Sequence, residues 1–203
     1  MTNLLWGDDW VQKMLLSSKT AVFADLWYRA QAAAHGNIPF KRDIPLRDLA
    51  PLMPWLIMHK RNDQGRTFCL LFGTALAELF GRDMTGSYFE EAMALEDSSA
   101  RQASFTAYGA EFGEEAPFCR YVLGKFNSKL GLQVQFESLA FPYVEEADQS
   151  LRTIVHVLPL QTMTYGDSFT PQFSEQTVKM FHPMQRRPDW LHMTAARKHV
   201  EQR

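Results

Sequence analysis

The hydrophobic residues of this chain recur at helical spacing near its start and at strand spacing further along. Over residues 19–35 the apolar positions fall on one helical face, which predicts an amphipathic N-terminal helix. Residues 37–55 contain four prolines, which exclude one long helix and predict an irregular lead-in. Residues 56–62 and 67–73 are apolar runs separated by a short polar turn, a pattern typical of a β-hairpin.

A segment interrupted by glycines follows this hairpin. Gly73 permits a sharp exit from the second strand, and the apolar spacing then predicts a short helix over 75–80. Gly81 ends that helix, because glycine enters the left-handed conformation freely. A further short helix is predicted to begin near Ser87, and a longer one over 98–112.

Three more strands are predicted after these helices, over 117–126, 132–143 and 151–161. The second of them alternates apolar and polar residues at its start, which is typical of a half-buried strand. Strands on both sides of a helical middle favour an α+β fold with an antiparallel sheet.

The chain divides into three parts. Residues 1–18 form an N-terminal extension of mixed composition, residues 19–165 form one domain, and residues 166–203 become polar and lose their periodicity. The last part contains three prolines and is predicted to be a polar C-terminal tail.

Composition narrows the partners of the protein. The 203 residues are 46% hydrophobic, which is enough for one domain with its own core. The net charge of −2 gives no electrostatic signature of nucleic-acid binding. Two lone cysteines indicate a reduced compartment, and the chain starts without a signal-peptide pattern. No stretch is long and apolar enough to span a bilayer, so we expect a cytoplasmic protein without nucleic-acid or membrane partners.

Two motifs carry a resemblance to a known family. They are "RDIPLRDLAPLMPWLIM" over 42–58 and "FGTALAELFGRDMTGSYFEEAM" over 72–93. With the Trp27 helix and "LAFPY" over 139–143, they resemble the PAS domain family, in particular a bacterial subfamily of stand-alone PAS proteins. The resemblance covers about residues 20–165. It implies a PAS-like five-stranded antiparallel sheet, with helices between strands two and three and an added N-terminal helix.

The resemblance also implies a pocket, because the sheet and the middle helices of PAS domains enclose a site for a small molecule. The pocket candidates are Cys69, Leu71, Phe89, Phe105, Tyr108, Phe112, Tyr121, Phe136, Ser138 and His156. His156 lies between valines in a strand and has two interpretations. It is either a polar pocket contact that titrates near neutrality or a hydrogen-bonded structural residue.

The second strand of the hairpin departs from the family pattern. Alternation places Phe68, Leu70 and Phe72 on one face, opposite Cys69 and Leu71. A strand that is apolar on both faces needs cover on both. We expect Phe68 and Leu70 to pack on the N-terminal helix or on a second subunit, so the expected partner is a protein or a second copy. The interface candidates are Phe23, Trp27, Phe68 and Leu70.

Two PAS cofactors are disfavoured because their ligands are missing. Haem in PAS sensors usually needs an axial histidine on the long middle helix, and residues 98–112 contain neither His nor Cys. Light-sensing flavin domains need a Cys in an Asn-Cys-Arg motif before that helix, and "EDSSARQ" contains none. The six histidines lack metal-ligand spacing, so no metal site is predicted and the cofactor is left open.

The two cysteines are expected to remain free thiols. Cys69 and Cys119 lie on strands that PAS topology places at opposite edges of the sheet, which is too far apart for a disulfide.

The resemblance implies a non-catalytic sensory or regulatory module that binds a small molecule, a protein partner or both. No catalytic residue is predicted, because the Ser and Cys residues lie in no nucleophile motif. One alternative is a small cone-shaped enzyme of the cystatin-like type, which would need a carboxylate beside His156 inside the pocket. Another is a purely structural dimerisation module without a cavity.

Overall fold

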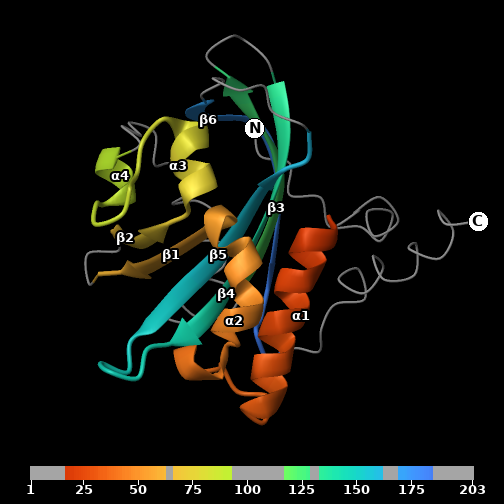
Figure 1. The fold of residues 1–203 in the computed structure, drawn as a ribbon, viewed down its shortest axis with the longest axis vertical. Coiled ribbons are helices and arrows are strands. Elements are labelled where there is room, and N and C mark those ends of the chain that lie inside the picture. The colour runs from red at the N-terminus through yellow and green to blue at the C-terminus, as the bar shows by residue number, and fades with distance from the viewer. Residues whose placement is uncertain (1–16, 63–65, 93–116, 129–132, 162–168, 185–203) are drawn as a thin grey trace, which may run out of the picture.

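The computed structural model describes residues 17–62, 66–92, 117–128, 133–161 and 169–184 (Figure 1). Its helices are α1 (Ser18–Ala33), the 3₁₀ helix η2 (Lys41–Asp43), α2 (Leu46–Leu49), the 3₁₀ helix η3 (Ala50–Trp55), α3 (Thr74–Phe80) and α4 (Phe89–Ala92). Its strands are β1 (Leu56–Arg61), β2 (Thr67–Phe72), β3 (Cys119–Ser128), β4 (Gln133–Val144), β5 (Leu151–Pro159) and β6 (Phe169–Phe181).

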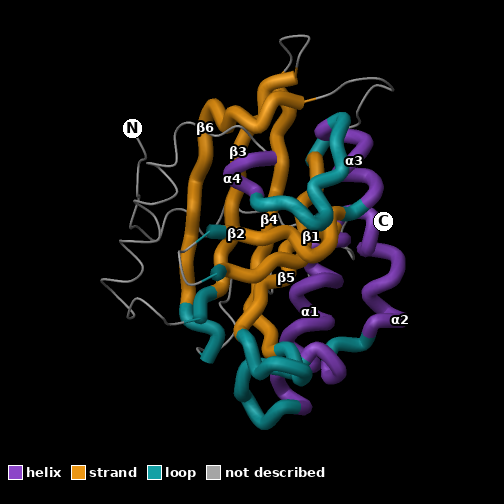
Figure 2. Tube along the Cα trace, turned by 90° about the vertical axis from the view of Figure 1, so that its left-hand side faces the viewer, coloured by secondary structure: helices purple, strands orange, loops and turns teal. Residues whose placement is uncertain are grey.

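The described strands form one antiparallel sheet in the order β2-β1-β5-β4-β3-β6, so the predicted α+β class is confirmed. Side chains on one face of this sheet pack with α1, and those on the other face pack with α3. Figures 1 and 2 show α1 running beside β4 and β5, and α3 and α4 gathered near β1 and β2. The sheet therefore separates two hydrophobic clusters, which we call the α1-side cluster and the α3-side cluster.

The first helix forms where the sequence predicts it. Ser17 is its N-cap, because the Ser17 hydroxyl accepts a hydrogen bond from the backbone N–H of Thr20 at 3.1 Å. Trp27 stacks on Phe141 of β4 with ring centroids 4.5 Å apart, and its Nε1 donates to the carbonyl of Pro142 at 2.8 Å. Packing and a directed hydrogen bond together hold α1 on β4.

The glycine after β2 is required by a close crossing of the backbone. A Cβ atom added to Gly73 would lie 2.3 Å from the carbonyl oxygen of Pro54 in η3. The Gly73 N–H donates to the carbonyl of Leu56 at 2.8 Å, which fixes the turn. After α3, Gly81 takes the predicted left-handed conformation, with φ of 66°. The glycines thus let η3, β2 and α3 meet without a side chain between them.

Residues 169–181, which we predicted to belong to a polar tail, form strand β6 instead. β6 pairs with β3 along its length and lies at the end of the sheet. The register shifts twice between Lys125 and Asn127, so a regular alternation of apolar and polar residues is lost. The described sheet consequently has six strands, where the PAS resemblance implied five.

The predicted faces of β2 are also wrong at one end. The pairing with β1 shifts between Met58 and His59, so Leu70 is an extra residue opposite that step. Cys69 and Phe72 therefore both lie in the α3-side cluster, whereas Leu71 packs on the α1-side cluster. Strict alternation had grouped Phe72 with Phe68, because a one-residue bulge moves every later side chain to the other face.

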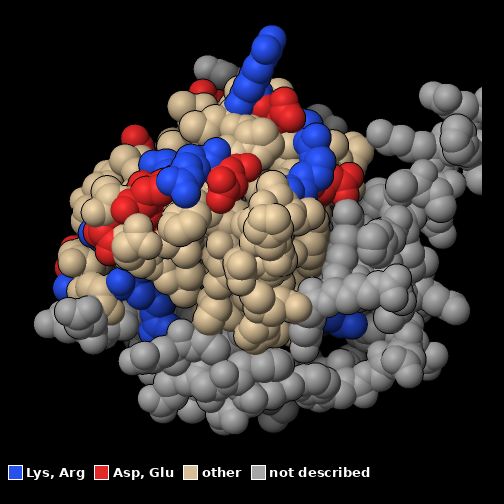
Figure 3. Space-filling model, turned by 90° about the horizontal axis from the view of Figure 1, so that it is seen from below, with Lys and Arg blue, Asp and Glu red and all other residues tan. Residues whose placement is uncertain are grey.

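Charged residues cluster where the β4–β5 hairpin meets η2. Arg152 contacts Glu145 at 2.8 Å and Asp148 at 2.9 Å, and Lys41 contacts Glu145 at 3.3 Å. Figure 3 views the molecule from below and shows positive and negative side chains interspersed on this face. Ion pairs of this kind fasten the hairpin to η2 and leave no patch of one sign in view.

Candidate functional site

The predicted pocket residues do not come together in one place. Phe105, Tyr108 and Phe112 lie outside the described residues. The others divide between the two faces of the sheet. On the α3 side are Cys69, Phe89, Phe136 and, from its pairing with Val122 and Val157, Ser138. On the α1 side are Leu71, Tyr121 and His156.

The α3-side cluster is dominated by aromatic rings. Phe126 and Phe136 stack with ring centroids 3.9 Å apart, and Phe80 meets Phe126 edge-on at 5.4 Å. The ring centroid of Phe72 lies 6.0 Å from that of Phe80 and 6.2 Å from that of Phe89. This continuous set of rings is a largely buried apolar surface between the sheet, α3 and α4.

Cys69 lies at this surface but is not set up for thiolate chemistry. Its side chain is fully buried, and burial raises the pKa of the Cys69 thiol to about 11. Burial also raises the pKa of Cys119 well above the ordinary value, on the opposite face of the sheet. Both cysteines are free, as the sequence predicted.

The α1 side contains a buried polar cluster that we call the α1 latch, composed of Ser17, Thr20, Glu137 and His156. The Ser17 N–H donates to Oε2 of Glu137 at 2.8 Å, and the Ser17 and Thr20 hydroxyls lie 2.9 Å apart. Oγ1 of Thr20 lies 3.2 Å from Nδ1 of His156. Hydrogen bonds thus run from β4 through the first turn of α1 to β5.

Burial sets the charge states of this latch. Glu137 and His156 are both 0% exposed. Burial raises the pKa of Glu137 to about 7, and hydrogen bonds from Ser17 and Thr20 limit the rise. Burial lowers the pKa of His156 to about 3, with a further contribution from the charge of Lys19. At neutral pH the imidazole is therefore uncharged, while the carboxyl group lies near its titration midpoint.

Each of these two side chains keeps one polar atom without a hydrogen-bond partner among the described residues. The atoms are Oε1 of Glu137 and Nε2 of His156. A buried polar atom without a hydrogen bond costs free energy of folding, because it has lost its contacts with water. The fold accepts this cost at the α1 latch.

The described contacts of His156 are made with α1. Its ring stacks on Phe23 at 5.5 Å and bonds to Thr20, both on α1. It therefore faces α1 and lies on the opposite side of the sheet from Phe136.

Sequence reasoning missed Glu137, which it had placed on the polar side of an alternating strand. The signal was present further along the same strand. Leu139, Phe141 and Tyr143 share the face of Glu137, and all three are 0% exposed. A face that is apolar over three successive positions predicts that the fourth is buried too.

The four interface candidates differ in how far they are buried and in what covers them. Phe23 and Trp27 are 2% and 1% exposed, so both are occupied by packing on their own sheet. Phe68 packs edge-on against Tyr88 at 5.3 Å, which supplies cover from within the chain instead of from the N-terminal helix. The loop before α4 also bonds the edge of β2, through Cys69 N–H to Ser87 and Gly86 N–H to Cys69. Leu70 is half-buried.

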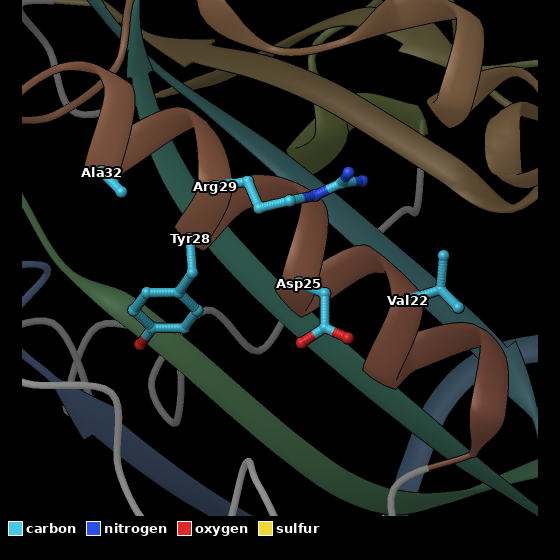
Figure 4. Close-up of a pocket in the computed structure, with 5 residues that line it drawn as sticks. All are labelled: Val22, Asp25, Tyr28, Arg29 and Ala32. Atoms are coloured by element: carbon cyan, nitrogen blue, oxygen red, sulfur yellow. The ribbon is translucent and has the colours of Figure 1, made fainter. Parts of the chain in front are cut away.

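A groove that the sequence did not predict runs along α1. It has a volume of about 500 Å³ and is lined by Val22, Asp25, Tyr28, Arg29 and Ala32 (Figure 4). The figure shows Asp25 and Tyr28 pointing to one flank of the helix and Arg29 to the other. The groove therefore lies along a flank of α1 where Tyr28 also contacts Phe141 of β4, and its lining carries charge of both signs.

Within the described ranges, no group of three or more His, Cys, Asp or Glu side chains is arranged to hold a metal ion. No helix there has the length and apolar character needed to cross a bilayer. Comparison of the sequence with protein-family models and with curated proteins finds no match.

Proposed function

We propose that the protein is a non-catalytic, cytoplasmic sensory or regulatory module of the PAS type. It binds an apolar small molecule on the α3 side of its sheet and signals through protein–protein contacts. The observation that carries this proposal is the arrangement of the sheet. If β6 is set aside, β2 and β3 are the two outer strands of the sheet. These strands carry Cys69 and Cys119, and the resemblance implies that the strands of these two cysteines lie at opposite edges.

The α3 side supports the choice of ligand class. The rings of Phe72, Phe80, Phe126 and Phe136 form one apolar surface there, and Ser138 adds a buried hydroxyl on the same face. Small-molecule sites in proteins are mostly apolar and aromatic with a few polar groups that orient the ligand. An aromatic or aliphatic compound with one polar group fits this composition.

The α1 side supports the choice of output. The α1 latch joins α1 to β4 and β5 through Glu137 and His156, and these strands carry Phe136 and Val157 on the opposite face. A ligand that moves β4 or β5 would therefore act directly on the hydrogen bonds that hold α1. The coupling needs no separate output domain.

Native mass spectrometry of the purified full chain, before and after denaturation, tests the proposal. We expect a small molecule to remain bound to the native protein and to be lost on denaturation. Phe136→Ala should weaken its retention, because the ring lies on the proposed binding surface. Leu139→Ala is the matched control, since Leu139 is equally buried on the same strand but faces α1.

Two results would count against this function. One is a native protein that carries no small molecule and gains none when apolar compounds are added. The other is equal loss of the bound molecule in both variants, which would indicate a general loss of stability rather than a site on the α3 side.

The structure gives less support to the alternative of a cystatin-like enzyme than to a binding role. That alternative needs an acid–base pair that reaches a substrate, and the closest described arrangement is Glu137 linked through Thr20 to His156. Both side chains are 0% exposed beneath α1, which leaves no contact surface for a substrate. We therefore propose a binding role rather than catalysis.

A further inference from the structure

The two outer strands of the described sheet differ in what lies along their outer edges. β2 is covered by its own chain, because the loop before α4 bonds to its backbone. The Cys69 N–H donates to the carbonyl of Ser87, and the Gly86 N–H donates to the carbonyl of Cys69, both at 2.9 Å. Oγ1 of Thr85 accepts from the Phe72 N–H at 3.0 Å. This edge of the sheet is therefore closed to a further strand.

β6 forms the other end of the sheet, and among the described strands it pairs with β3 alone (Figure 2). From Glu175 to Phe181 it follows β3 residue by residue without a register shift. The N–H and C=O groups of a strand point alternately to its two edges, so this part of β6 directs a regular row of donors and acceptors away from β3. Such a row is a template for pairing with another strand.

Two prolines limit the stretch that can pair. Pro171 lies near the start of β6, and Pro183 lies two residues after its end. Proline has no N–H to donate, so residues 172–182 form the uninterrupted stretch between them. Thr177 is the midpoint of this stretch. Two copies that pair antiparallel through all of it, about a two-fold axis, therefore place Thr177 on that axis.

The charged residues of the same stretch select the same midpoint. Glu175 and Lys179 are its only Asp, Glu, Lys or Arg residues, and each is two positions from Thr177. In the two-fold pairing each Glu175 stands opposite the partner's Lys179, and no other antiparallel register achieves this. Within its own chain Glu175 is in register with Lys125, and Lys179 with Tyr121. The backbone edge therefore supplies the attachment, and the charges select the register.

We propose that β6 is a self-association strand, through which two copies of this chain pair antiparallel over residues 172–182 and form one continuous sheet. A second copy suits this edge better than an unrelated strand, because the stretch is complementary to itself about Thr177. The site lies at the opposite end of the sheet from β2, which carries the interface candidates Phe68 and Leu70. The pairing names the protein partner and does not depend on the ligand proposed above.

Reversal of single charges in the full chain tests the pairing. Lys179→Glu makes two carboxylates face each other on both sides of the axis, and Glu175→Lys does the same with two ammonium groups. We expect each variant to raise the dissociation constant of the dimer about tenfold, measured by analytical ultracentrifugation over a dilution series. An equimolar mixture of the two variants, one of them ¹⁵N-labelled, should form mixed dimers in native mass spectrometry, because opposite charges then face each other at both positions.

Arg47→Glu provides the control, since it makes the same change of charge on the exposed surface of α2 and should leave the dissociation constant unchanged. Circular dichroism of each variant checks that the fold is kept. A natural protein that stays monomeric throughout the dilution series would overturn the proposal, and so would a dimer that Lys179→Glu does not weaken. Neither result bears on small-molecule retention, so the two proposals fail separately.

A disulfide on the two-fold axis gives an independent readout. Thr177→Cys brings two thiols to paired positions with Cα atoms about 5 Å apart, within the range of a disulfide. Met180→Cys is the matched control, because its two copies lie about 20 Å apart along the paired strands. We expect Thr177→Cys to cross-link two copies about tenfold faster than Met180→Cys under mild oxidation, while the buried Cys69 and Cys119 stay reduced. Equal rates for the two variants would contradict pairing about Thr177.

Discussion

Glu137 and His156 are both fully buried in the α1 latch, and burial moves their pKa values in opposite directions. An acid kept from water favours its neutral form, so the pKa of Glu137 rises to about 7. A base kept from water also favours its neutral form, so the pKa of His156 falls to about 3. One environment therefore gives the protein two opposing dependences of stability on pH.

The sign for Glu137 follows from proton linkage. Between its ordinary value of 4.5 and about 7, the folded protein keeps a proton that the unfolded chain loses. The free energy of unfolding therefore falls as pH rises through this window. For His156 the unfolded chain gains the proton between 6.5 and about 3, so stability is lost as pH falls through that window.

We predict that Glu137→Gln becomes more stable than the natural protein as pH rises. The amide oxygen can still accept from Ser17 N–H, but the group no longer ionises while buried. Relative to the natural protein, the variant should gain about 2–3 kcal/mol in free energy of unfolding between pH 4 and pH 8. Urea unfolding at both pH values measures the difference.

The partly exposed Glu146 provides the control for this prediction. Hydrogen bonding to the backbone of Arg42 lowers the pKa of Glu146, so Glu146→Gln should shift the pH dependence in the opposite direction. A Glu137→Gln profile parallel to that of the natural protein would mean that Glu137 does not titrate in this window.

At the scale of elements, β6 shows that a segment can join a sheet although its sequence lacks a regular alternation of apolar and polar residues. Its residues pair with β3 across two register shifts, and its last residue closes the core beneath α1. The hydrogen bonds of β6 come from its pairing with β3, which the composition of β6 does not predict.

We predict that Phe181→Ala lowers the free energy of unfolding by about 3 kcal/mol, because it empties a buried aromatic site beside Phe141. Met184→Ala, at a side chain 50% exposed, should change stability by less than about 0.5 kcal/mol. Chemical denaturation of both variants gives the comparison. Equally small effects of the two substitutions would contradict a buried Phe181 and would favour the predicted polar tail over residues 169–184.

At the scale of the whole molecule, the sheet divides the core into two clusters that share few side chains. Phe23 and Phe141 belong to the α1-side cluster and contact each other at 5.5 Å. Leu76 is 0% exposed in the α3-side cluster. Side chains of the two clusters can therefore be substituted separately, so that effects on the proposed ligand side and on the α1 side can be measured apart.

Double-mutant cycles test this separation. Phe23→Leu and Leu76→Ala should be additive to within about 0.5 kcal/mol, because the sheet lies between them. Phe23→Leu and Phe141→Leu should show a coupling of about 1 kcal/mol, because the rings touch. A strong coupling across the sheet would contradict two independent clusters.

Local signals were enough to predict several elements of this fold. The period of residues 19–35 predicted α1, and the five predicted strands all exist, within a few residues of their expected ends. Gly81 ends α3 in the left-handed conformation as expected. These features depend on backbone preferences and on the spacing of apolar residues, which are properties of neighbouring positions.

The remaining features depend on which segments meet in space. The bulge at Leu70 arises in the pairing with β1, and β6 gains its hydrogen bonds from β3. Glu137 is buried because α1 covers it and donates to it from Ser17. The predicted pocket set divided between two faces for the same reason. Pairing partners and covering layers come from distant parts of the chain, so local periodicity cannot assign the face or the burial of such residues.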